Sequence, residues 1–510
     1  MEMMMRLLYV FAVLSMLISC GPQLKPVSEQ RNLIPGELPD PSIIEVDGTY
    51  YLTGSSNDWG PVYPIYQSTD LKNWSFVTYV FAEQPSWTIN SFWAPELYYR
   101  DGKFYCYYTA RRTDGVSGIG VAVTDDITKG FEDKGQIIEW GSEAIDAFVY
   151  EDQGKLYITW KAYGLNPDKP ITILGSELSE DGLSLKGAVF TVLEADADGW
   201  ERGGIEGQCI VKKGDYLYML YSGNACCGSG CDYMVGVARS KSMLGPWKKY
   251  VANPLLKGNA QWKCPGHGTA VEVNENWQYV YHAYSSEGFP NMGRTNLISQ
   301  INWDSSSEWP YIDIPNDSTE VKLVTIDFRD EFDDETINYR WRYDIPSKHF
   351  TASLDSGTLH LSETGEGNNP SGSSLVIDPQ VADFTLQTTI SQQNKSLKGL
   401  ILYVTKSNNL GFGVAGDSLI VWKVKDGEFN ELERIAVKSF NKIDLKADVV
   451  DAQEITFSYK LDNDEWQTIK TAVSGDNLAW WSWGMKAGVF IKGADHNGEG
   501  AFDEFSISYH

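Results

Sequence analysis

Three carboxylic acids stand where an acidic side chain is costly unless it is paired or reactive. Asp40 is flanked by two prolines, which fix the backbone around the carboxylate. Asp146 stands inside an apolar run, and Glu206 follows glycines that let a ligand approach the chain closely. Each acid alone is better explained as a turn cap or an ion-paired group. Together they could perform acid–base chemistry, because an apolar setting or a nearby like charge lifts the pKa of a carboxyl group that must carry a proton at neutral pH.

The composition limits the classes of protein to be considered. The 510 residues are 42% hydrophobic and 22% charged, a balance that excludes a disordered or collagen-like chain, and the length exceeds that of one ordinary domain. A net charge of −27 opposes binding to the phosphates of nucleic acids, so DNA and RNA are poor partners. The 18 Trp and 28 Tyr suit either the stacking of sugar rings or a β-rich core.

The first twenty residues predict export. Arg6 precedes an apolar run, residues 7–18, which has the length of a signal-peptide core and is too short to span a bilayer as a helix. The run ends in the motif LISC, which resembles a bacterial lipobox; the alternative is a plain secretory signal with a coincidental cysteine. We therefore expect a lipoprotein signal peptide over residues 1–20, lipidation at Cys20 and a tether over residues 21–30. This lipid anchor would be the one membrane contact of a protein in the bacterial envelope, either periplasmic or surface-facing.

Export also permits disulfide bonds among the remaining cysteines. Three of them crowd one glycine- and serine-rich loop, and we expect either Cys226 or Cys227 to pair with Cys231 as a staple of that loop. The others stand alone in strand-like runs and are expected to be small buried hydrophobic side chains: Cys106, Cys209 and Cys264.

Beyond the tether, short alternating runs predict an all-β chain. Five runs each follow a turn signal such as Asp47-Gly48 and recur at intervals of roughly fifty to sixty residues. They are residues 50–53, 103–108, 155–160, 216–221 and 277–281. Such a recurring unit is typical of propeller blades, so we predict a five-bladed β-propeller over residues 31–314. Similar phrases at residues 68–74, 124–131 and 240–247 indicate one inter-strand connection used three times.

A second β-rich region is predicted over residues 327–510, after a short polar linker at residues 315–326. Its first and last apolar and acidic segments could be adjacent strands of one β-sandwich. A tryptophan cluster precedes a late apolar run and could belong to an interdomain core: Trp480, Trp481 and Trp483. Because the linker is short, we expect a large interface and a sandwich that shapes the pocket of the propeller, rather than a tethered binding module.

The candidate acids belong to a series of short segments spread along the predicted propeller. These are Asp40-Pro41-Ser42, Trp93-Ala94-Pro95-Glu96, Ile145-Asp146, Ile205-Glu206-Gly207, Tyr221-Ser222-Gly223-Asn224, Gly266-His267-Gly268 and Gly293-Arg294. In this order the segments resemble glycoside hydrolase family 43, and the C-terminal region resembles the concanavalin-like, jelly-roll β-sandwich of the β-xylosidase branch. Two departures leave substrate preference open: Gln208 replaces a frequent proline, and the cysteine-rich loop is not a general family feature.

The resemblance implies an inverting glycoside hydrolase. Asp40 would be the general base that activates water, and Glu206 the general acid that protonates the leaving oxygen. Asp146 would raise the pKa of Glu206 and orient it. Inversion requires room for a water molecule between base and acid, which places their carboxyl groups about 6.5–9.5 Å apart.

The resemblance also assigns weaker roles around the pocket. His267 would lie near the propeller axis, where some family members hold a calcium ion through water; the alternative is a satisfied core histidine. No cofactor would be required beyond this possible structural calcium. Arg294 would reach substrate hydroxyls, unless it forms a structural ion pair. Trp93 and Trp59 would form apolar walls for a sugar ring, or pack between blades. Phe148 would share the strand side of Asp146 and keep water from the cavity.

The expected activity is exo-acting release of pentose, as xylose or arabinofuranose, from plant cell-wall oligosaccharides derived from xylan or arabinan. Two alternatives stay open at this stage. One is a galactan- or galactofuranose-directed hydrolase of the same family. The other is a non-catalytic glycan-binding lipoprotein with the same aromatic side chains.

Overall fold

The computed structural model describes residues 31–163, 171–313, 323–476, 478–479 and 481–510. Strands dominate this part of the chain, and its helical elements are three single turns of 3-10 helix, which confirms the all-β prediction. The turns are η1 (Ile127–Lys129), η2 (Ile345–Ser347) and η3 (Ala494–His496). Within the described ranges, no helix has the length and apolar character needed to cross a membrane.

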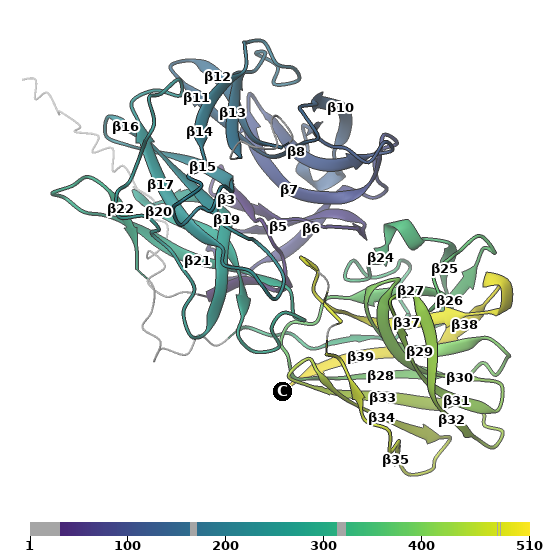
Figure 1. Cartoon of the computed structure of the whole chain (residues 1–510). Helices are drawn as coiled ribbons and strands as arrows, with labels where there is room; N and C mark the ends of the chain where they lie inside the picture. The colour runs from purple at the N-terminus through teal and green to yellow at the C-terminus, as the bar shows by residue number, and fades with distance from the viewer. Residues whose placement is uncertain (1–30, 164–170, 314–322, 477, 480) are drawn as a thin grey trace, which may run out of the picture.

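The N-terminal region is a five-bladed propeller, as predicted (Figure 1). The strands within each blade are antiparallel, and a parallel pairing of Glu143 with Ser117 joins blades two and three. Blade one contains β2 (Ser42–Val46), β3 (Thr49–Thr53), β5 (Val62–Ser68) and β6 (Ser75–Phe81), and blade two contains β7 (Thr88–Arg100), β8 (Lys103–Arg112), β9 (Ser117–Thr124) and β10 (Glu132–Ile138). Blade three contains β11 (Glu143–Asp152), β12 (Lys155–Tyr163), β13 (Thr172–Glu177) and β14 (Phe190–Glu194), and blade four contains β15 (Ile205–Lys213), β16 (Tyr216–Gly223), β17 (Met234–Ser240) and β18 (Lys248–Lys249). Blade five contains β19 (Trp262–Val273), β20 (Asn276–Ser285), β21 (Arg294–Trp303), the short β22 (Pro310–Ile312) and the N-terminal strand β1 (Arg31–Glu37).

The five runs predicted from turn signals are the second strands of the five blades: β3, β8, β12, β16 and β20. In the first of these hairpins Asp47 and Gly48 adopt φ angles of 51° and 80°, the left-handed backbone that the turn signal predicts. The three similar connecting phrases each join the third strand of a blade to the fourth. The ring closes because β1 pairs with β21, with Arg31 opposite Ile298.

The C-terminal region is a β-sandwich. One sheet has the order β23 (Phe328–Asp330), β39 (Glu504–Tyr509), β28 (Phe384–Ile390), β33 (Ile443–Val450), β34 (Glu454–Leu461) and β35 (Gln467–Thr468), with β36 (Val473–Ser474) on β34. The other has the order β27 (Ser373–Ile377), β37 (Lys486–Lys492), β29 (Leu397–Thr405), β30 (Asn408–Ala415), β31 (Ser418–Lys425) and β32 (Glu428–Ala436). A small third sheet contains β25 (Phe350–Asp355), β26 (Thr358–Glu363) and β38 (Glu499–Phe502). As predicted, the first and last segments are adjacent strands, since Phe328 of β23 lies opposite Ile507 of β39.

The propeller and the sandwich lie side by side (Figure 1). Strand pairing, side-chain packing and hydrogen bonds join them. Strand β4 (Trp59–Gly60) of the propeller pairs with β24 (Tyr343–Asp344) of the sandwich. Trp59 is 2% exposed, packs in a cluster of sandwich side chains and stacks edge-on against Tyr403. The Arg342 guanidinium donates a hydrogen bond to the Trp59 carbonyl at 2.9 Å. The prediction that Trp59 forms a wall of the sugar pocket is therefore wrong. The pairing of β4 with β24 directs its side chain into the interface between the propeller and the sandwich.

A buried ion-pair cluster joins the ring-closing strand to the sandwich. Lys486 on β37 places its Nζ 2.5 Å from Oε2 of Glu37 on β1 and also contacts Asp378. The Gly484 N–H lies 3.2 Å from Oε1 of the same Glu37. The Lys486 and Glu37 side chains are 3% and 4% exposed and that of Asp378 is 22% exposed, so this largely buried cluster ties the position of the sandwich to the closed ring.

The cysteines pair differently from the predicted staple. Cys226 is bonded to its neighbour Cys227, and Cys231 is bonded to Cys264, with Cα atoms 6.0 Å apart. Cys264 is therefore not an isolated hydrophobic side chain. Its partner is 33 residues away in sequence, on a loop of the preceding blade, so spacing alone could not reveal the bond. Cys106 and Cys209 are buried thiols, as expected.

Candidate active site

A cavity of about 590 Å³ receives side chains from all five blades and from the sandwich. Its lining includes Asp40, Asp58, Trp93, Arg111, Glu143, Asp146, Lys161, Glu206, Cys226, Cys227, His267, Arg294, Trp481 and Trp483. The three candidate acids lie in it together, although they are far apart in the sequence. The sequence-predicted side chains Trp93, His267 and Arg294 also reach it.

Irregular backbone directs these side chains into the cavity. The innermost strands β11, β15 and β19 each carry a register shift at Asp146, Glu206 or His267. Asp40, Asp146 and His267 have φ angles of 51°, 60° and 35°, a region that residues with a side chain seldom adopt. Bulges and left-handed residues re-aim side chains that a regular strand would direct elsewhere. Some of the strained backbone thus lies where the chemistry would take place.

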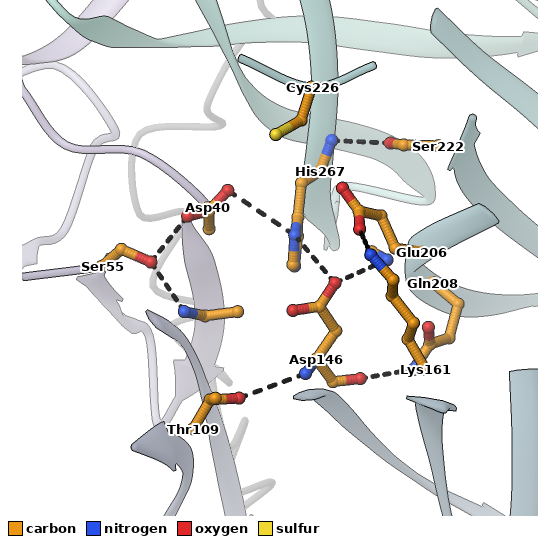
Figure 2. A network of polar contacts seen from close by, with 12 residues as sticks. Asp40, Ser55, Thr109, Asp146, Lys161, Glu206, Gln208, Ser222, Cys226 and His267 are labelled. Atoms are coloured by element: carbon orange, nitrogen blue, oxygen red, sulfur yellow. Dashed lines mark hydrogen bonds and ion pairs between the residues drawn. The ribbon is translucent and has the colours of Figure 1, made fainter. Parts of the chain in front are cut away.

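Asp40 is buried in a set of donors (Figure 2). Ser55 Oγ donates to its Oδ2 at 2.6 Å, and Arg294 Nη1 donates to Oδ1 at 3.0 Å. The Asp40 N–H donates to Nδ1 of His282 at 3.1 Å; burial lowers the pKa of this histidine to about 4, so the ring is neutral and can accept. Burial alone would raise the pKa of Asp40, but the Arg294 guanidinium beside it opposes this effect and holds that pKa well below its usual value. Asp40 is therefore a carboxylate at neutral pH.

Asp146 is held from both sides. Its N–H donates to Thr109 Oγ1 at 3.2 Å, and the Gly207 N–H donates to its Oδ2 at 3.2 Å (Figure 2). Gln208 Nε2 donates to the Asp146 carbonyl at 2.6 Å, which gives the unusual glutamine a local function. Burial raises the pKa of Asp146 to about 6, although the facing His267 opposes the shift.

Glu206 is buried against two donors. Tyr233 OH donates to Oε1 at 2.7 Å, and the Lys161 ammonium contacts Oε2. Burial favours the protonated form, but Lys161 outweighs it and lowers the pKa of Glu206. We expected the raised pKa on Glu206; in this state of the site it falls on Asp146, because the ammonium lies beside Glu206.

His267 lies between two of the acids. Its Nδ1 is 3.6 Å from Oδ1 of Asp40 and 3.6 Å from Oδ2 of Asp146, and its backbone N–H donates to Ser222 Oγ at 2.7 Å (Figure 2). Among the described residues, no three His, Cys, Asp or Glu side chains are arranged to hold a metal ion. The surroundings of His267 thus do not form a ligand set, and calcium at this position stays a prediction.

The predictions for Trp93 and Phe148 have different outcomes. Trp93 lines the cavity, with its ring 5.7 Å from that of Trp481 and the Arg111 guanidinium 5.5 Å from its centroid. Phe148 instead packs in the apolar core between blades three and four, with neighbours such as Tyr157. The prediction for Phe148 is wrong because β11 shifts register between Ile145 and Phe148, so strand alternation from Asp146 no longer applies.

Sequence reasoning missed four side chains around the acids: Ser55, Lys161, Tyr233 and His282. Lys161 carried the same signal as Asp146, a charge in an apolar strand, and its side chain is 6% exposed. Ser55, Tyr233 and His282 lie in runs with ordinary β composition, and only the three-dimensional arrangement distinguishes them.

Comparisons with known proteins agree with this architecture. A family model described as glycosyl hydrolases family 43 matches residues 30–310, and one described as beta xylosidase C-terminal concanavalin A-like domain matches residues 329–508. A xylan 1,3-beta-xylosidase of a Vibrio species is 25% identical, over 88% of this chain and 92% of its own length. A non-reducing end alpha-L-arabinofuranosidase of Bacteroides ovatus is 26% identical, over 69% of this chain and 68% of its own.

A solved structure shows the same fold. The xylan beta-1,4-xylosidase from Bacillus halodurans C-125 matches with a TM-score of 0.78 at 22% identity, covering 94% of this chain and 100% of that one. The propeller, the sandwich and the order of the motifs therefore agree with one family throughout. The protein belongs to glycoside hydrolase family 43 and is a glycosidase of the β-xylosidase/arabinofuranosidase type with a concanavalin A-like C-terminal domain.

Proposed function

We propose that this protein is an exo-acting, inverting hydrolase that releases pentose units from xylan- or arabinan-derived oligosaccharides. The observation that carries the proposal is the gathering of Asp40, Asp146 and Glu206 in one cavity with unlike electrostatic surroundings. The cavity is lined on one side by Trp481 and Trp483 of the sandwich, which favours a short pocket over an open groove and hence action on chain ends.

In the proposed reaction Asp40 acts as general base. Its Arg294 and Ser55 contacts keep it ionised, so it can accept a proton from water as the water oxygen bonds to the anomeric carbon. The bond from that carbon to the leaving oxygen breaks at the same time, and Glu206 delivers its proton to this oxygen. The products are the free sugar with inverted configuration and the shortened saccharide, with Asp40 protonated and Glu206 ionised until the proton returns through solvent.

Glu206 must carry a proton to perform this role, and Lys161 opposes it. We assign the proton of the Asp146/Glu206 pair to Asp146 before substrate binds. A glycosidic oxygen placed against Glu206 separates its carboxylate from the Lys161 ammonium, which raises the pKa of Glu206 and lets it take up the proton. Asp146 is thus a positioning residue, whose charge beside Glu206 then favours the protonated acid.

The preference for pentoses rests on the relatives. The proteins similar over most of this chain include the Vibrio xylosidase, and a partial match is an extracellular exo-alpha-(1->5)-L-arabinofuranosidase of Cellvibrio japonicus, 29% identical over 54% of this chain and 86% of its own length. A panel of aryl β-xyloside, α-L-arabinofuranoside, β-galactoside and β-galactofuranoside tests the choice of sugar. Turnover of a galactoside alone would replace the pentose assignment.

Proton NMR during early turnover tests the stereochemistry. The released sugar is expected to appear first as the inverted anomer, and a retained anomer would refute Asp40 as the base. The Glu206→Gln variant, which keeps the shape but has no acidic proton, is expected to release no sugar from an unactivated oligosaccharide. Equal release by this variant and the parent would contradict the role of Glu206.

We further propose that the mature protein is anchored to the envelope through Cys20, on the strength of the LISC motif after the apolar run. Cys20 lies outside the described residues. Detergent phase partitioning of the parent and of a Cys20→Ala form tests the anchor. Equal partitioning of both would refute it.

A further inference from the structure

Two adjacent cysteines, joined to each other, are part of the cavity wall. Cys226 and Cys227 both line the 590 Å³ cavity, and both are half-buried. Figure 2 shows the Cys226 side chain on the His267 side of the network, with its sulfur turned to the side on which Asp40 lies. The acid–base roles proposed above make no use of this pair.

The Cys226–Cys227 bond contributes little to holding the chain together. A disulfide stabilises a fold chiefly by closing a loop of the unfolded chain, and a bond between sequence neighbours closes none. The stapling of this loop is already provided by Cys231–Cys264, which ties it to β19 three residues before His267. The role of the adjacent pair must therefore be local, in the shape and chemistry of the surface it presents.

The loop holds that surface in a fixed position. Its first residue, Asn224, donates through its N–H to the Glu201 carbonyl at 3.2 Å, and the Asp232 N–H donates to the Ala225 carbonyl at 3.0 Å. Gly228 approaches the sandwich so closely that a Cβ there would lie 3.2 Å from the Trp481 carbonyl oxygen. The pair is thus fixed between the propeller and the tryptophan side of the pocket.

Cys226 is also connected to the proposed acid through one intervening side chain. Cys226 packs against a cluster that contains Tyr233 and Tyr284, and the Tyr233 OH donates to Glu206 at 2.7 Å. The cavity lining combines the acids and other polar side chains with indole rings and the two cysteines. A sugar ring has both kinds of surface, with hydroxyls at its edge and C–H groups on its faces. Sulfur is polarizable and weakly hydrated, so it suits contact with such a C–H face.

We propose that the Cys226–Cys227 disulfide is a specificity-determining contact surface for the sugar unit bound beside the carboxylates. This rests on the proposed function, because it assigns the ligand of the same pocket. The joined side chains form an apolar surface against one C–H face of the unit. Opening the bond replaces this surface with two separate thiols that turn independently and hydrate.

Two double variants test the assignment, each losing one disulfide and keeping the other. In Cys226→Ala/Cys227→Ala we expect the dissociation constant of free xylose or arabinose, measured by titration calorimetry, to rise about tenfold. KM is expected to rise similarly and kcat to change less than threefold. Cys231→Ala/Cys264→Ala is the matched control and keeps the contact surface. Circular dichroism and thermal unfolding of both variants establish that they fold.

Dithiothreitol supplies a second measurement that requires no folding of a variant. Reduction is expected to weaken pentose binding by the parent and by the Cys231→Ala/Cys264→Ala control, but not by Cys226→Ala/Cys227→Ala. An unchanged pentose affinity in Cys226→Ala/Cys227→Ala, or a reductant effect confined to proteins that retain Cys231–Cys264, would overturn the proposal. If the parent hydrolyses no pentoside at all, the proposed function fails instead, and the calorimetric comparison still reports on the contact surface.

Discussion

The propeller and the sandwich are built from the same kind of strand and use it in opposite ways. In the sandwich, β28 alternates buried and half-buried residues along its length and pairs with β33 and β39 without a shift in register. In the propeller, the innermost strands β7, β11, β15 and β19 all shift register near the cavity. Regular strands such as β28 keep a sheet in shape, whereas the interrupted strands around the cavity direct particular side chains into it. The propeller should therefore supply the catalytic side chains. The sandwich should supply part of the pocket lining and stabilise the propeller.

The sharpest test of this division is removal of the proposed base or acid. Asp40→Ala and Glu206→Ala are each expected to lower kcat by about three orders of magnitude or more, because water loses its activator or the leaving oxygen its proton. Glu96→Gln is the matched control, a buried acid on β7 that accepts a hydrogen bond from Ser42 at 2.9 Å. A fall in kcat as large in Glu96→Gln as in the other two would break the comparison.

The bracing is tested at Lys486. Lys486→Met removes the cation beside the buried Glu37 carboxylate, while Asp378 keeps Arg342 at 3.8 Å, and we expect the protein to lose about 3–5 kcal/mol of unfolding free energy. The thermal unfolding midpoint reports the loss. Arg434→Met, which breaks an exposed pair with Glu431 within the sandwich, is expected to change the midpoint little. Equal midpoints for the two variants would show that the interface does not brace the molecule.

The electrostatics of the propeller site are tested at Lys161. Removing the Lys161 ammonium beside Glu206 raises the pKa of Glu206. The proposed reaction requires Glu206 in its protonated form. The basic limb of the kcat/KM profile of Lys161→Met should therefore move to higher pH. The acidic limb, set by Asp40 and its Arg294 contact, should stay in place. A downward shift of the basic limb would contradict the assignment of that limb to Glu206.

The contribution of the sandwich to the pocket is the smallest expected effect. Trp481→Ala removes an indole that faces Trp93, and KM should rise about tenfold with little change in kcat. Trp466→Ala, which removes a sandwich tryptophan packed between Lys446 and Lys460, is the control and should leave KM unaltered. If kcat fell as much in Trp481→Ala as in the Asp40 variant, the sandwich would take part in the chemistry.

The sequence predicted what depends on local pattern. Turn signals located the second strand of every blade, and acids placed beside prolines, within an apolar run or after glycines indicated Asp40, Asp146 and Glu206, which lie in one cavity. Patterns failed where the backbone departs from regularity or where distant segments meet. Strand alternation placed Phe148 in the cavity because the β11 bulge cannot be read from residue types, and Trp59 was misplaced because its pairing with the sandwich joins residues nearly 300 positions apart.

The cysteines illustrate the same limit. Loop spacing favoured a bond to Cys231 from within the loop, but the partner of Cys231 is Cys264 on the next blade. The pKa pattern was also beyond reach, because the direction of the Glu206 shift depends on a lysine from another strand. Residue types indicated which acids lie in the site. Their protonation states depend on side chains that lie close to them only in the folded protein.

The pairing of β1 with β21 has a consequence for the order of folding. Arg31 lies opposite Ile298, so the chain must supply blades one to five before its first strand finds a partner. Contacts of such long sequence separation form late and slowly, because the entropy of closing the loop must be overcome first. Until then β1 is an exposed edge that invites pairing with other chains.

The same strand, β1, also forms part of the interface between the propeller and the sandwich. Glu37 of β1 receives Lys486 and the Gly484 N–H from the segment that follows Trp481. These contacts therefore require both β1 and the sandwich to be in their final positions. Chains in which the sandwich has not docked would hold the three carboxylates without Trp481 and Trp483. The pocket therefore becomes complete only in molecules in which both regions have folded.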